Sequence, residues 1–579
     1  MPGFYINSMP SRVALKNLYP QRCVMETLTE NEVTIKRYTL NKFMRDKAFC
    51  ETAELAFVTE GVILNLRDLL EEYGATTVDE LVPTMYRKTG ELFFSRFVGP
   101  FAGALYDKKQ KAWLVWTNHV GDKAVFYSVS PELFTAGSQV NYVIDAFREK
   151  SIPLSFDEQA AYQMLTFGFM EGDRTYAQEI KRLRGGQYIK YANGKLEVKE
   201  YFMLHHHPER LAGKSDEEII DALDAAMRHA SELEYAKDEE YRYEHFSDLS
   251  GGLDARMNMW IAHTIKPKHI QFMTYCKANY LDEIIAKQLA AHWHDEIIVK
   301  PLDDVSFLYE IDDIVFMNAG LSLYSGITGG KRMLEHVNMD VYGLEHTGQL
   351  NGGIIGTYLS AIGGGKQPTG MYSEKLKDRL TETNHSDFDD HEMYMLYTRG
   401  FRGVMNTQLI RSNYTEAWTT TTHPEVMQLC MDVPVEKRLN HSLYKKWILS
   451  KYPEAAKYKW EKTGGVINEN KGLTFVRKVI RRGPNKLKKM MGLTVYNNSG
   501  MNPIDYWIAN SNELRTFLDT YEESGIKWLP NSISSRFITD LRNLYHSGNA
   551  SEKAMVLTVL SAAKLYFGEE TNGEDCPEN

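Results

Sequence analysis

Cysteine is scarce in this chain, and the few cysteines stand far apart. There are five in 579 residues, and none of them forms a CxxC or a Cys/His pair at metal-ligand spacing. Disulfide-stabilised secreted domains and structural zinc sites both need paired or clustered cysteines. The pattern argues against both classes and predicts a protein of a reducing compartment, the cytoplasm.

Long hydrophobic runs and an excess of positive charge are missing as well. A membrane-spanning helix needs a run of about 18 apolar residues, and the sequence has none. The first residues, Met1–Ile6, lack the basic segment and apolar stretch of a signal peptide. The formal net charge of −10 argues against general nucleic-acid binding. With 25% charged and 43% hydrophobic residues, the chain has the composition of a soluble globular protein with more than one domain.

One glycine-rich stretch carries most of the functional signal. Phe246–Arg256 is predicted to form a buried strand, a Ser250-Gly251-Gly252 loop and a helix that starts near Asp254. Adjacent glycines let the backbone approach a ligand, and the N–H groups of such a turn form an anion site. Ser250 adds a hydroxyl donor, and Asp254 adds a carboxylate suited to Mg²⁺ beside phosphates. No Gly-Lys-Ser/Thr closes the loop, so it is not a Walker motif; a plain strand-to-helix turn is the alternative interpretation.

This loop resembles that of a known family. Ser-Gly-Gly-x-Asp at 250–254 is similar to the pyrophosphate loop of ATP pyrophosphatases, which split ATP into AMP and pyrophosphate. Four further segments resemble the glutaminase domain of glutamine-dependent asparagine synthetases: 99–107, 118–123, 166–175 and 184–188. The chain is therefore similar to the asparagine synthetase family, which includes β-lactam synthetases that keep the glutaminase fold without using glutamine.

The resemblance implies an α/β protein in three parts. Residues 1–205 would form an αββα sandwich of the N-terminal-nucleophile (Ntn) hydrolase type. Residues 206–470 would form a Rossmann-like parallel sheet that carries the ATP-pyrophosphatase site. Residues 471–579 would be a helical extension of that domain, ending in a disordered acidic tail.

The local sequence patterns favour the same arrangement. Short apolar runs separated by turn residues predict strands in the first part, Leu92–Tyr106 and Ala112–Thr117 among them, and a helical pattern intervenes at Leu66–Tyr73. Strand and helix patterns alternate over 246–300, which is typical of a parallel sheet with crossover helices. Ligands of such sheets lie beyond the carboxyl ends of the strands, and the loop at 250–254 is expected there.

The glutaminase-like part departs from the family at its reaction centre. The family has a nucleophilic cysteine after the initiator Met, whereas this chain has Pro2, which carries no thiol. The family's Asn-Gly-Glu motif falls on Glu60–Val62, and its glutamine-binding Asp falls on Asn118. Three losses in one pocket predict a domain without glutaminase activity that serves as a structural or interface domain.

The second family loop matches only in part. Leu344–Tyr358 is similar to the family's loop for ATP and the adenylated substrate, and Thr347 and Gly348 match it in kind. The acidic positions of that loop have become uncharged: they are Gln349, Gly352 and Gly353. Their loss removes carboxylates that would bind a metal or help to deprotonate a nucleophile. Glu345, beside the loop, is a candidate replacement.

Two further motifs bear on the same site. Trp460–Gly465 resembles the loop whose lysine, here Lys462, neutralises the leaving pyrophosphate; a solvated surface lysine is the alternative. Asp282 and Glu283 fall where the family carries a Ser-Asp-Glu helix start. We interpret both carboxylates as partners of the helix N-terminal dipole.

By resemblance, the chain is an ATP-dependent, AMP-forming amide ligase that adenylates a carboxylate and transfers an amine or ammonia to it without its own glutaminase. The cofactors would be ATP and Mg²⁺, with Lys462 and Asp254 catalytic and Asp254 holding the metal. The ATP and pyrophosphate site would comprise Leu249, Ser250, Gly251, Gly252, Asp254, Thr347 and Gly348. The substrate would be a small-molecule or glycan carboxylate; an ammonia-supplying partner and a homodimer are both compatible with this interpretation. A non-catalytic nucleotide- or partner-binding homologue and a true glutamine-hydrolysing asparagine synthase remain the alternatives.

The last part of the chain is predicted to be helical over 517–521, 533–545 and 554–567, with apolar residues at spacings of three and four. A basic stretch at 477–489 precedes these helices. It is either a solvated helix face or a contact for an acidic lipid-linked substrate or membrane surface.

Overall fold

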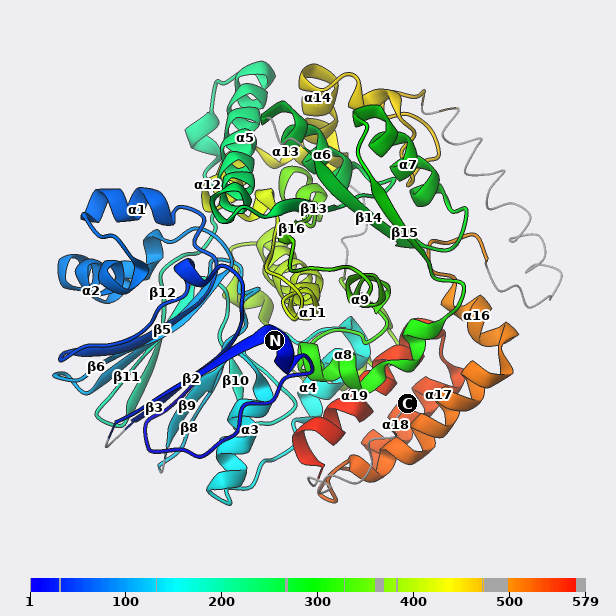
Figure 1. The fold of residues 1–579 in the computed structure, drawn as a ribbon. Helices are drawn as coiled ribbons and strands as arrows, with labels where there is room; N and C mark the ends of the chain where they lie inside the picture. The colour runs from blue at the N-terminus through cyan, green and yellow to red at the C-terminus, as the bar shows by residue number, and fades with distance from the viewer. Residues whose placement is uncertain are drawn as a thin grey trace.

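A computed structural model describes most of the chain (Figure 1). The described residues are 2–30, 33–131, 133–265, 269–326, 328–359, 369–381, 384–470, 472 and 498–568. The basic stretch at 477–489 and the acidic tail beyond residue 568 lie outside them. Of the helices so described, none has the length and apolarity that crossing a membrane requires.

The N-terminal part contains two six-stranded antiparallel sheets. The first has the order β10-β8-β9-β1-β3-β2 and the second the order β12-β11-β7-β6-β5-β4. The strands of the first sheet are β1 (Gly3–Asn7), β2 (Cys23–Glu30), β3 (Val33–Leu40), β8 (Phe126–Val129), β9 (Phe134–Gly137) and β10 (Lys181–Arg182). Those of the second are β4 (Phe49–Glu51), β5 (Leu55–Gly61), β6 (Phe101–Asp107), β7 (Ala112–Thr117), β11 (Gln187–Ala192) and β12 (Lys195–Glu200).

The two sheets stack face to face, with helices outside. Phe4 and Ile6 of β1 pack against Val58 of β5 and Ala104 of β6 in the core between the sheets. Helices α1 (Leu66–Tyr73) and α2 (Val78–Thr89) cover the outer face of the second sheet. Helix α3 (Val140–Glu149) covers the first, and α4 (Glu158–Phe167) follows it. This arrangement confirms the predicted αββα sandwich.

One predicted strand of this part was wrong in its first half. Residues 92–96 of the predicted strand Leu92–Tyr106 lie instead in a 3₁₀ helix (Gly90–Arg96), and β6 starts only at Phe101. Phe93 and Phe94 of that helix are buried against Trp116. Periodicity alone cannot tell a short apolar run in a buried strand from one in a buried helical turn.

The central part is a five-stranded parallel sheet, as predicted. Its strands, in the order β15-β14-β13-β16-β17, are β15 (Ile297–Pro301), β14 (Ile270–Cys276), β13 (Glu244–Asp248), β16 (Tyr342–His346) and β17 (Ala417–Trp418). Helices α5 (Asp216–Tyr241), α6 (Leu253–Ile265) and α7 (Leu281–Trp293) accompany them. From β13 the chain proceeds outward to β14 and β15 and then returns to β16 on the other side of β13. Such a reversal of strand order opens a crevice at the carboxyl ends of the two strands.

Shorter helices complete this part. Helices α8 (Ile311–Asn318) and α9 (Thr328–Glu335) lie between β15 and β16 in the sequence. After β16 come α10 (His391–Met395), α11 (Gln408–Arg411), α12 (Pro424–Asp432), α13 (Val435–Arg438) and α14 (Ser442–Lys451). Two π-helices occur in the same region, η6 (Gly352–Gly356) and η9 (Leu396–Gly403). π-Helices are rare in proteins, and many of those that occur lie at functional sites.

The C-terminal helices connect the first two parts. They are α16 (Ile504–Asn510), α17 (Asn512–Gly525), α18 (Ser535–Ser547) and α19 (Ala550–Phe567). Most side chains of α19 are buried on all sides, so the helix lies inside a core rather than on a surface. It packs on α8 of the central part and also on α4 of the N-terminal part (Figure 1). The sequence predicted a helical extension of the central part and no contact with the N-terminal part.

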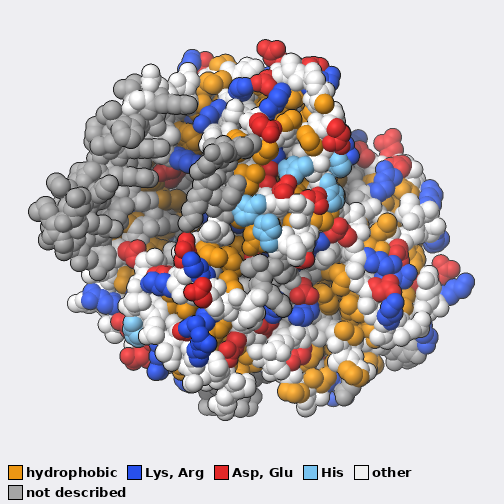
Figure 2. All heavy atoms as spheres, turned by 180° about the vertical axis from the view of Figure 1, so that it is seen from behind, with side chains coloured by type: hydrophobic (Ala, Val, Ile, Leu, Met, Phe, Trp, Pro, Cys, Tyr) orange, Lys and Arg blue, Asp and Glu red, His pale blue; other side chains and the backbone are white. Residues whose placement is uncertain are grey.

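Charges are mixed over the surface. Figure 2 shows acidic and basic side chains interspersed on the face opposite to that of Figure 1. Among the described residues on that face there is no broad basic area of the kind that tracks a nucleic-acid backbone.

Candidate functional site

The loop after β13 is held by its own side chains and by α7. The N–H of Gly251 donates to Oδ1 of Asp282 at 2.7 Å, and the N–H of Gly252 donates to Oγ of Ser250 at 3.2 Å. A Cβ on Gly251 would lie 3.0 Å from atoms of Asp282 and Glu461, so a larger residue would push these elements apart. A side chain at this position would have to displace these neighbours by a few tenths of an ångström, so glycine suits the narrow space through which the backbone passes.

Asp282 has a different role from the predicted one. Its side chain is buried and binds the glycine loop, instead of merely complementing the dipole of α7. Burial raises the pKa of Asp282 to about 6, although the bond from Gly251 acts in the opposite direction. Glu283 accepts the N–H of Asn279 at 2.7 Å just before the helix and pairs with Lys287 at 2.6 Å, and its predicted effect on the helix dipole stays a prediction. Sequence spacing could not separate these two adjacent carboxylates.

Asp254, in the first turn of α6, joins three segments. Its carboxylate accepts the N–H of Gly352 at 3.1 Å and the hydroxyl of Tyr444 at 3.1 Å. Burial raises the pKa of Asp254 to about 6 against these two bonds and the positive charge of Lys462. A buried carboxylate with few charged partners favours the approach of a cation, which replaces the lost hydration.

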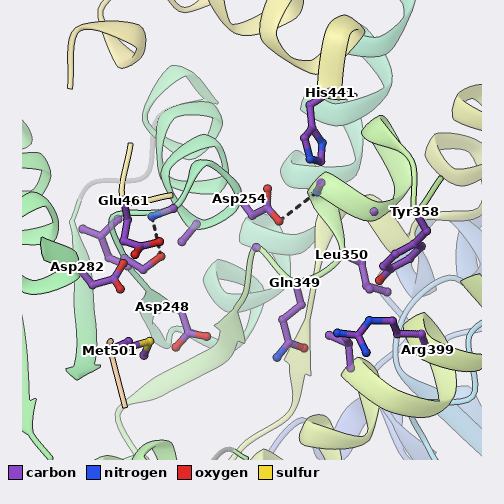
Figure 3. A pocket seen from close by; sticks show the side chains of 18 of the residues that line it. Asp248, Asp254, Asp282, Gln349, Leu350, Tyr358, Arg399, His441, Glu461 and Met501 are labelled. Atoms are coloured by element: carbon purple, nitrogen blue, oxygen red, sulfur yellow. Dashed lines mark hydrogen bonds between the residues drawn. The ribbon is translucent and has the colours of Figure 1, made fainter. Parts of the chain in front are cut away.

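These groups face a cavity of about 980 Å³ at the carboxyl ends of β13 and β16 (Figure 3). Five predicted site residues line it: Leu249, Ser250, Gly252, Asp254 and Gly348. Gly251 and Thr347 do not line it, and Thr347 is fully buried behind the wall. Tyr358, the last residue of the second family loop, lines the cavity as well. The sequence assigned no role to several other lining residues, namely Asp248, Arg399, Arg411, His441 and Glu461.

The second loop packs directly on the first. A Cβ on Gly348 would lie 2.5 Å from the backbone N of Ala255 and the backbone C of Asp254, so the loop touches the start of α6. Gly352 and Gly353, which replace acidic residues of the family, lie in the π-helix η6 and line the cavity. Gly356 leaves room for His441, whose Nδ1 would be 2.4 Å from an added Cβ.

Glu345 does not replace the missing acidic residues. It is fully buried and forms an ion pair with Arg411, which also binds Asp248 at 2.9 Å. The carboxylate of Glu345 does not line the cavity. Its charge is used to hold β13, β16 and α11 together.

The segment that precedes Lys462 reaches the glycine loop from more than 200 residues away. The N–H of Glu461 donates to the carbonyl of Gly251 at 3.1 Å. The guanidinium of Arg256 donates to the carbonyls of Gly251 at 3.2 Å and Tyr458 at 3.2 Å, and so fastens this segment to α6. Lys462 itself is exposed, with Nζ 5.5 Å from the ring centroid of Trp460.

Lys462 does not line the cavity, but its charge acts on groups that do. It helps to lower the pKa of Asp254 against the stronger effect of burial. Burial lowers the pKa of His441 to about 4, and the positive charge of Lys462 is the next largest cause of this decrease. The structure therefore brings Lys462 within electrostatic reach of both side chains.

A buried histidine supports the strands that carry both loops. Nδ1 of His346 lies 2.6 Å from Glu234 and Nε2 lies 2.7 Å from Asp238, both on α5. Asp238 also lies 2.9 Å from Nδ1 of His245 on β13. Burial alone would lower the pKa of His346, but the charges of Asp238 and Glu234 prevail and raise it to about 9. His346 is thus a cation that fixes β16 directly before Thr347.

The region that would hold glutamine in the N-terminal part contains buried ion pairs. Pro2 is buried at the start of β1. Glu60 lies 3.5 Å from Lys47 and 3.8 Å from Lys123, and both lysines also pair with Glu416, at 3.4 and 2.8 Å. Glu416 directly precedes β17, so these pairs cross from the sandwich to the parallel sheet.

Two other side chains of this region, Asn118 and Cys23, are also unsuited to glutamine chemistry. Asn118 donates to the carbonyl of Gly99 at 3.1 Å and to Asp122 at 2.6 Å, so its amide is used within its own loop. Cys23 could offer a thiol, but burial, with the charge of Glu60, raises its pKa to about 11. At neutral pH this thiol stays protonated and is a poor nucleophile.

Comparison with known proteins supports the N-terminal part of this description. Residues 48–202 match the model of a glutamine amidotransferase domain. The chain therefore carries a glutamine amidotransferase-like domain of the class II, Ntn type, although the match starts after Pro2 and covers less than half of the chain. No curated protein matches the chain.

Two solved structures are similar to parts of the chain. One is glutamine phosphoribosylpyrophosphate amidotransferase from B. subtilis complexed with ADP and GMP. It is 8% identical in sequence, the alignment covers 47% of this chain and 68% of that chain, and the TM-score is 0.22. The other is described as the allosteric regulatory enzyme of purine biosynthesis, with 10% identity, coverage of 52% and 74%, and a TM-score of 0.23.

Proposed function

We propose that this amidotransferase-domain protein is an ATP-dependent, AMP-forming amide ligase that does not use its own glutaminase. One observation carries the proposal. Three parts of the chain that are far apart in the sequence, residues 249–254, 348–353 and Glu461, converge on one cavity where the strand order of the parallel sheet reverses. Crevices of this kind are where open α/β sheets bind nucleotides.

The residues of the cavity fit Mg²⁺ and ATP by their chemistry. Asp254 and Asp282 offer carboxylate oxygens, and Ser250 offers a hydroxyl; Mg²⁺ prefers such oxygen ligands together with phosphate oxygens. When bound, the metal would offset the charge of the phosphates. The cavity volume is at the upper end of the range for ligand sites, which suits a nucleotide together with an acid.

Each group of the chain then has a defined task. Ser250 donates to the pyrophosphate, Asp254 holds the metal, and Lys462 stabilises the negative charge that gathers on the leaving pyrophosphate. Adenylation joins the acid's carboxylate oxygen to the α-phosphorus and releases pyrophosphate, so that AMP replaces oxide as the leaving group. In the second step an amine attacks the acyl carbon, the bond between that carbon and the phosphate oxygen breaks, AMP leaves, and the proton that the amine loses passes to solvent.

The nitrogen source follows from the N-terminal part. Pro2 stands at the position of the family's nucleophile and has no thiol, and Glu60, at a position of the family's glutamine-binding motif, is paired with Lys47 and Lys123. We propose that residues 1–205 act as a structural domain, and that the amine or ammonia comes from solvent or from an ammonia-supplying partner. The domain limits at 205 and 470, a homodimer and a cytoplasmic location stay predictions.

ATP–pyrophosphate exchange with a panel of carboxylic acids tests the proposal. We expect Mg²⁺-dependent exchange with at least one acid, and a loss of about 100-fold in Asp254→Asn, since removing a preorganised charged group typically costs that much. The control is Asp221→Asn, which changes an exposed carboxylate of α5. Exchange in Asp254→Asn at the wild-type rate would refute the role of this residue.

A second candidate function is a non-catalytic homologue that binds nucleotide or a partner protein. It is favoured by Gln349, Gly352 and Gly353, which line the cavity without charge. Calorimetric binding of ATP without exchange on any acid would support this candidate over the ligase.

A further inference from the structure

The charges around the cavity are unevenly paired. On the side of the glycine loop, Asp282 binds Gly251, and Arg411 is used by Glu345 and Asp248. Arg399 differs from these groups. It is half-buried, and in the part of the chain that the structure describes it pairs with no carboxylate. Its contacts are the carbonyl of Gly370 at 3.4 Å and the ring of Tyr372 at 5.5 Å.

The π-helix η9 places Arg399 in the cavity wall. Met395, directly before this helix, and Val404, directly after it, line the cavity together with Arg399. Figure 3 shows Arg399 beside Gln349, Leu350 and Tyr358, on the side away from Asp282 and Glu461. The guanidinium is therefore separated from the carboxylates of the glycine loop.

Gln349, the polar neighbour of Arg399 in the cavity wall, already has hydrogen-bond partners within the protein. The amide of Gln349 donates to the hydroxyl of Thr407 at 2.8 Å and accepts from Gln408 at 3.0 Å. Arg399 is left as the group on this side that can donate a fork of two hydrogen bonds to an anion. A guanidinium that is partly shielded from water in a partly apolar wall is stabilised when a carboxylate or phosphate binds it.

We propose that Arg399 forms an anion subsite for the acid substrate, so that this substrate carries a second negative group besides the carboxylate that is activated. The inference rests on the proposed function, because ATP at the glycine loop places the reacting carboxylate on that side. The rest of the acid then extends past Leu350 and Met395 to Arg399. Dicarboxylates and phosphorylated sugar acids have this chemistry, whereas a simple uronate has one negative group only.

The subsite is tested on the full chain by the protection of arginine side chains from modification by phenylglyoxal. Mass spectrometry measures the extent of modification of each arginine-containing peptide. The probes are succinate against butyrate, and glucuronate 1-phosphate against glucuronate, each with Mg²⁺ and a non-hydrolysable ATP analogue. We expect the two-anion probes to protect Arg399 at concentrations roughly tenfold below their one-anion counterparts, since one charge-assisted bond is worth about that factor. Equal protection by both members of each pair, or no protection by any probe, overturns the proposal.

Variants separate this role from nucleotide binding. Arg399→Met keeps the apolar stem and loses the charge, and Arg399→Lys keeps the charge and loses the fork. The control is Arg67→Met on the exposed face of α1. We expect the affinity for the ATP analogue, measured by calorimetry, to be unchanged in all three variants. In a competition assay, the preference for succinate over butyrate should disappear in Arg399→Met and become smaller in Arg399→Lys.

A weaker affinity of Arg399→Met for the ATP analogue would assign the residue to the phosphates and overturn the proposal. If the wild-type protein bound no ATP analogue, the proposed function would fail on its own. Selective protection of Arg399 by the two-anion probes would then still support an anion subsite.

Discussion

Gly348→Ala tests the contact between the two loops of the candidate site. The added Cβ would lie 2.5 Å from the N of Ala255 and the C of Asp254, and 2.6 Å from the carbonyl oxygen of Asp254. Ordinary contacts of carbon atoms are near 3.5 Å, so the loop and α6 must separate by about 1 Å. The φ angle of Gly348 lies outside the left-handed region, so the effect is purely steric.

The magnitude follows from this overlap. Overpacking a rigid backbone contact costs about 1–3 kcal/mol in the free energy of unfolding. The larger consequence is functional, because Asp254 moves relative to Gly352 and to the rest of the cavity. A displacement of about 1 Å at a positioned catalytic group costs on the order of 100-fold in rate.

The assay combines calorimetric binding of an ATP analogue with thermal unfolding. We expect Gly348→Ala to bind nucleotide at least tenfold more weakly, as roughly 1.4 kcal/mol of lost contact would cause, while the protein stays folded. The matched control is Gly500→Ala, where an added Cβ meets nothing within 4 Å. If Gly348→Ala bound the nucleotide as the control does, the packing of this loop on α6 would not position the site.

Two further predictions concern the buried groups around the site. The pKa of His346, about 9, lies above the ordinary value of 6.5, so its protonated form stabilises the fold. That contribution, on the order of 3 kcal/mol, is present below pH 6.5 and is lost as the pH rises through 9. Thermal unfolding as a function of pH should show this decline, and Glu234→Gln, which removes one carboxylate, should shift it to lower pH; identical profiles would contradict the assignment. Pro2→Cys should leave glutamate release from glutamine at background in a coupled assay, because Glu60, at a position of the family's glutamine-binding motif, stays paired with Lys47 and Lys123, and measurable release would show that the thiol was the only missing part.

Much of the fold was predictable because local patterns determine it. The helix at Leu66–Tyr73 and the strand at Ala112–Thr117 were predicted with the observed bounds, since amphipathic spacing and turn residues mark both. The strands β1 to β3, which build half of the first sheet, were not predicted. β1 pairs with the distant β9, with Tyr5 opposite Gly137, and a single chain segment does not reveal such a partner. β2 and β3 form a local hairpin, with Glu30 opposite Val33, whose sequence pattern was not recognised.

The candidate site was predictable in its glycine loop and not in its walls. The Ser-Gly-Gly spacing marked Ser250, Gly252 and Asp254, which do line the cavity. Asp282 was interpreted as a helix-dipole residue, because its bond to Gly251 spans 31 positions of sequence and leaves no local signal. Arg399 was missed for the same reason, since its neighbours in the wall come from several separate segments.

By itself the sequence pattern determined strand-rich stacked sheets, the parallel sheet and the turn that could receive phosphates, because periodicity, small residues and turn chemistry act over a few positions. The αββα type of the stacked sheets was implied by the resemblance to the asparagine synthetase family. Only the tertiary structure decided which carboxylates face the cavity, that Glu345 is bound to Arg411, and that Arg399 is left without a carboxylate partner among the described residues. Charge pairing and burial depend on distances in space, and these are set only when the strands and helices pack together.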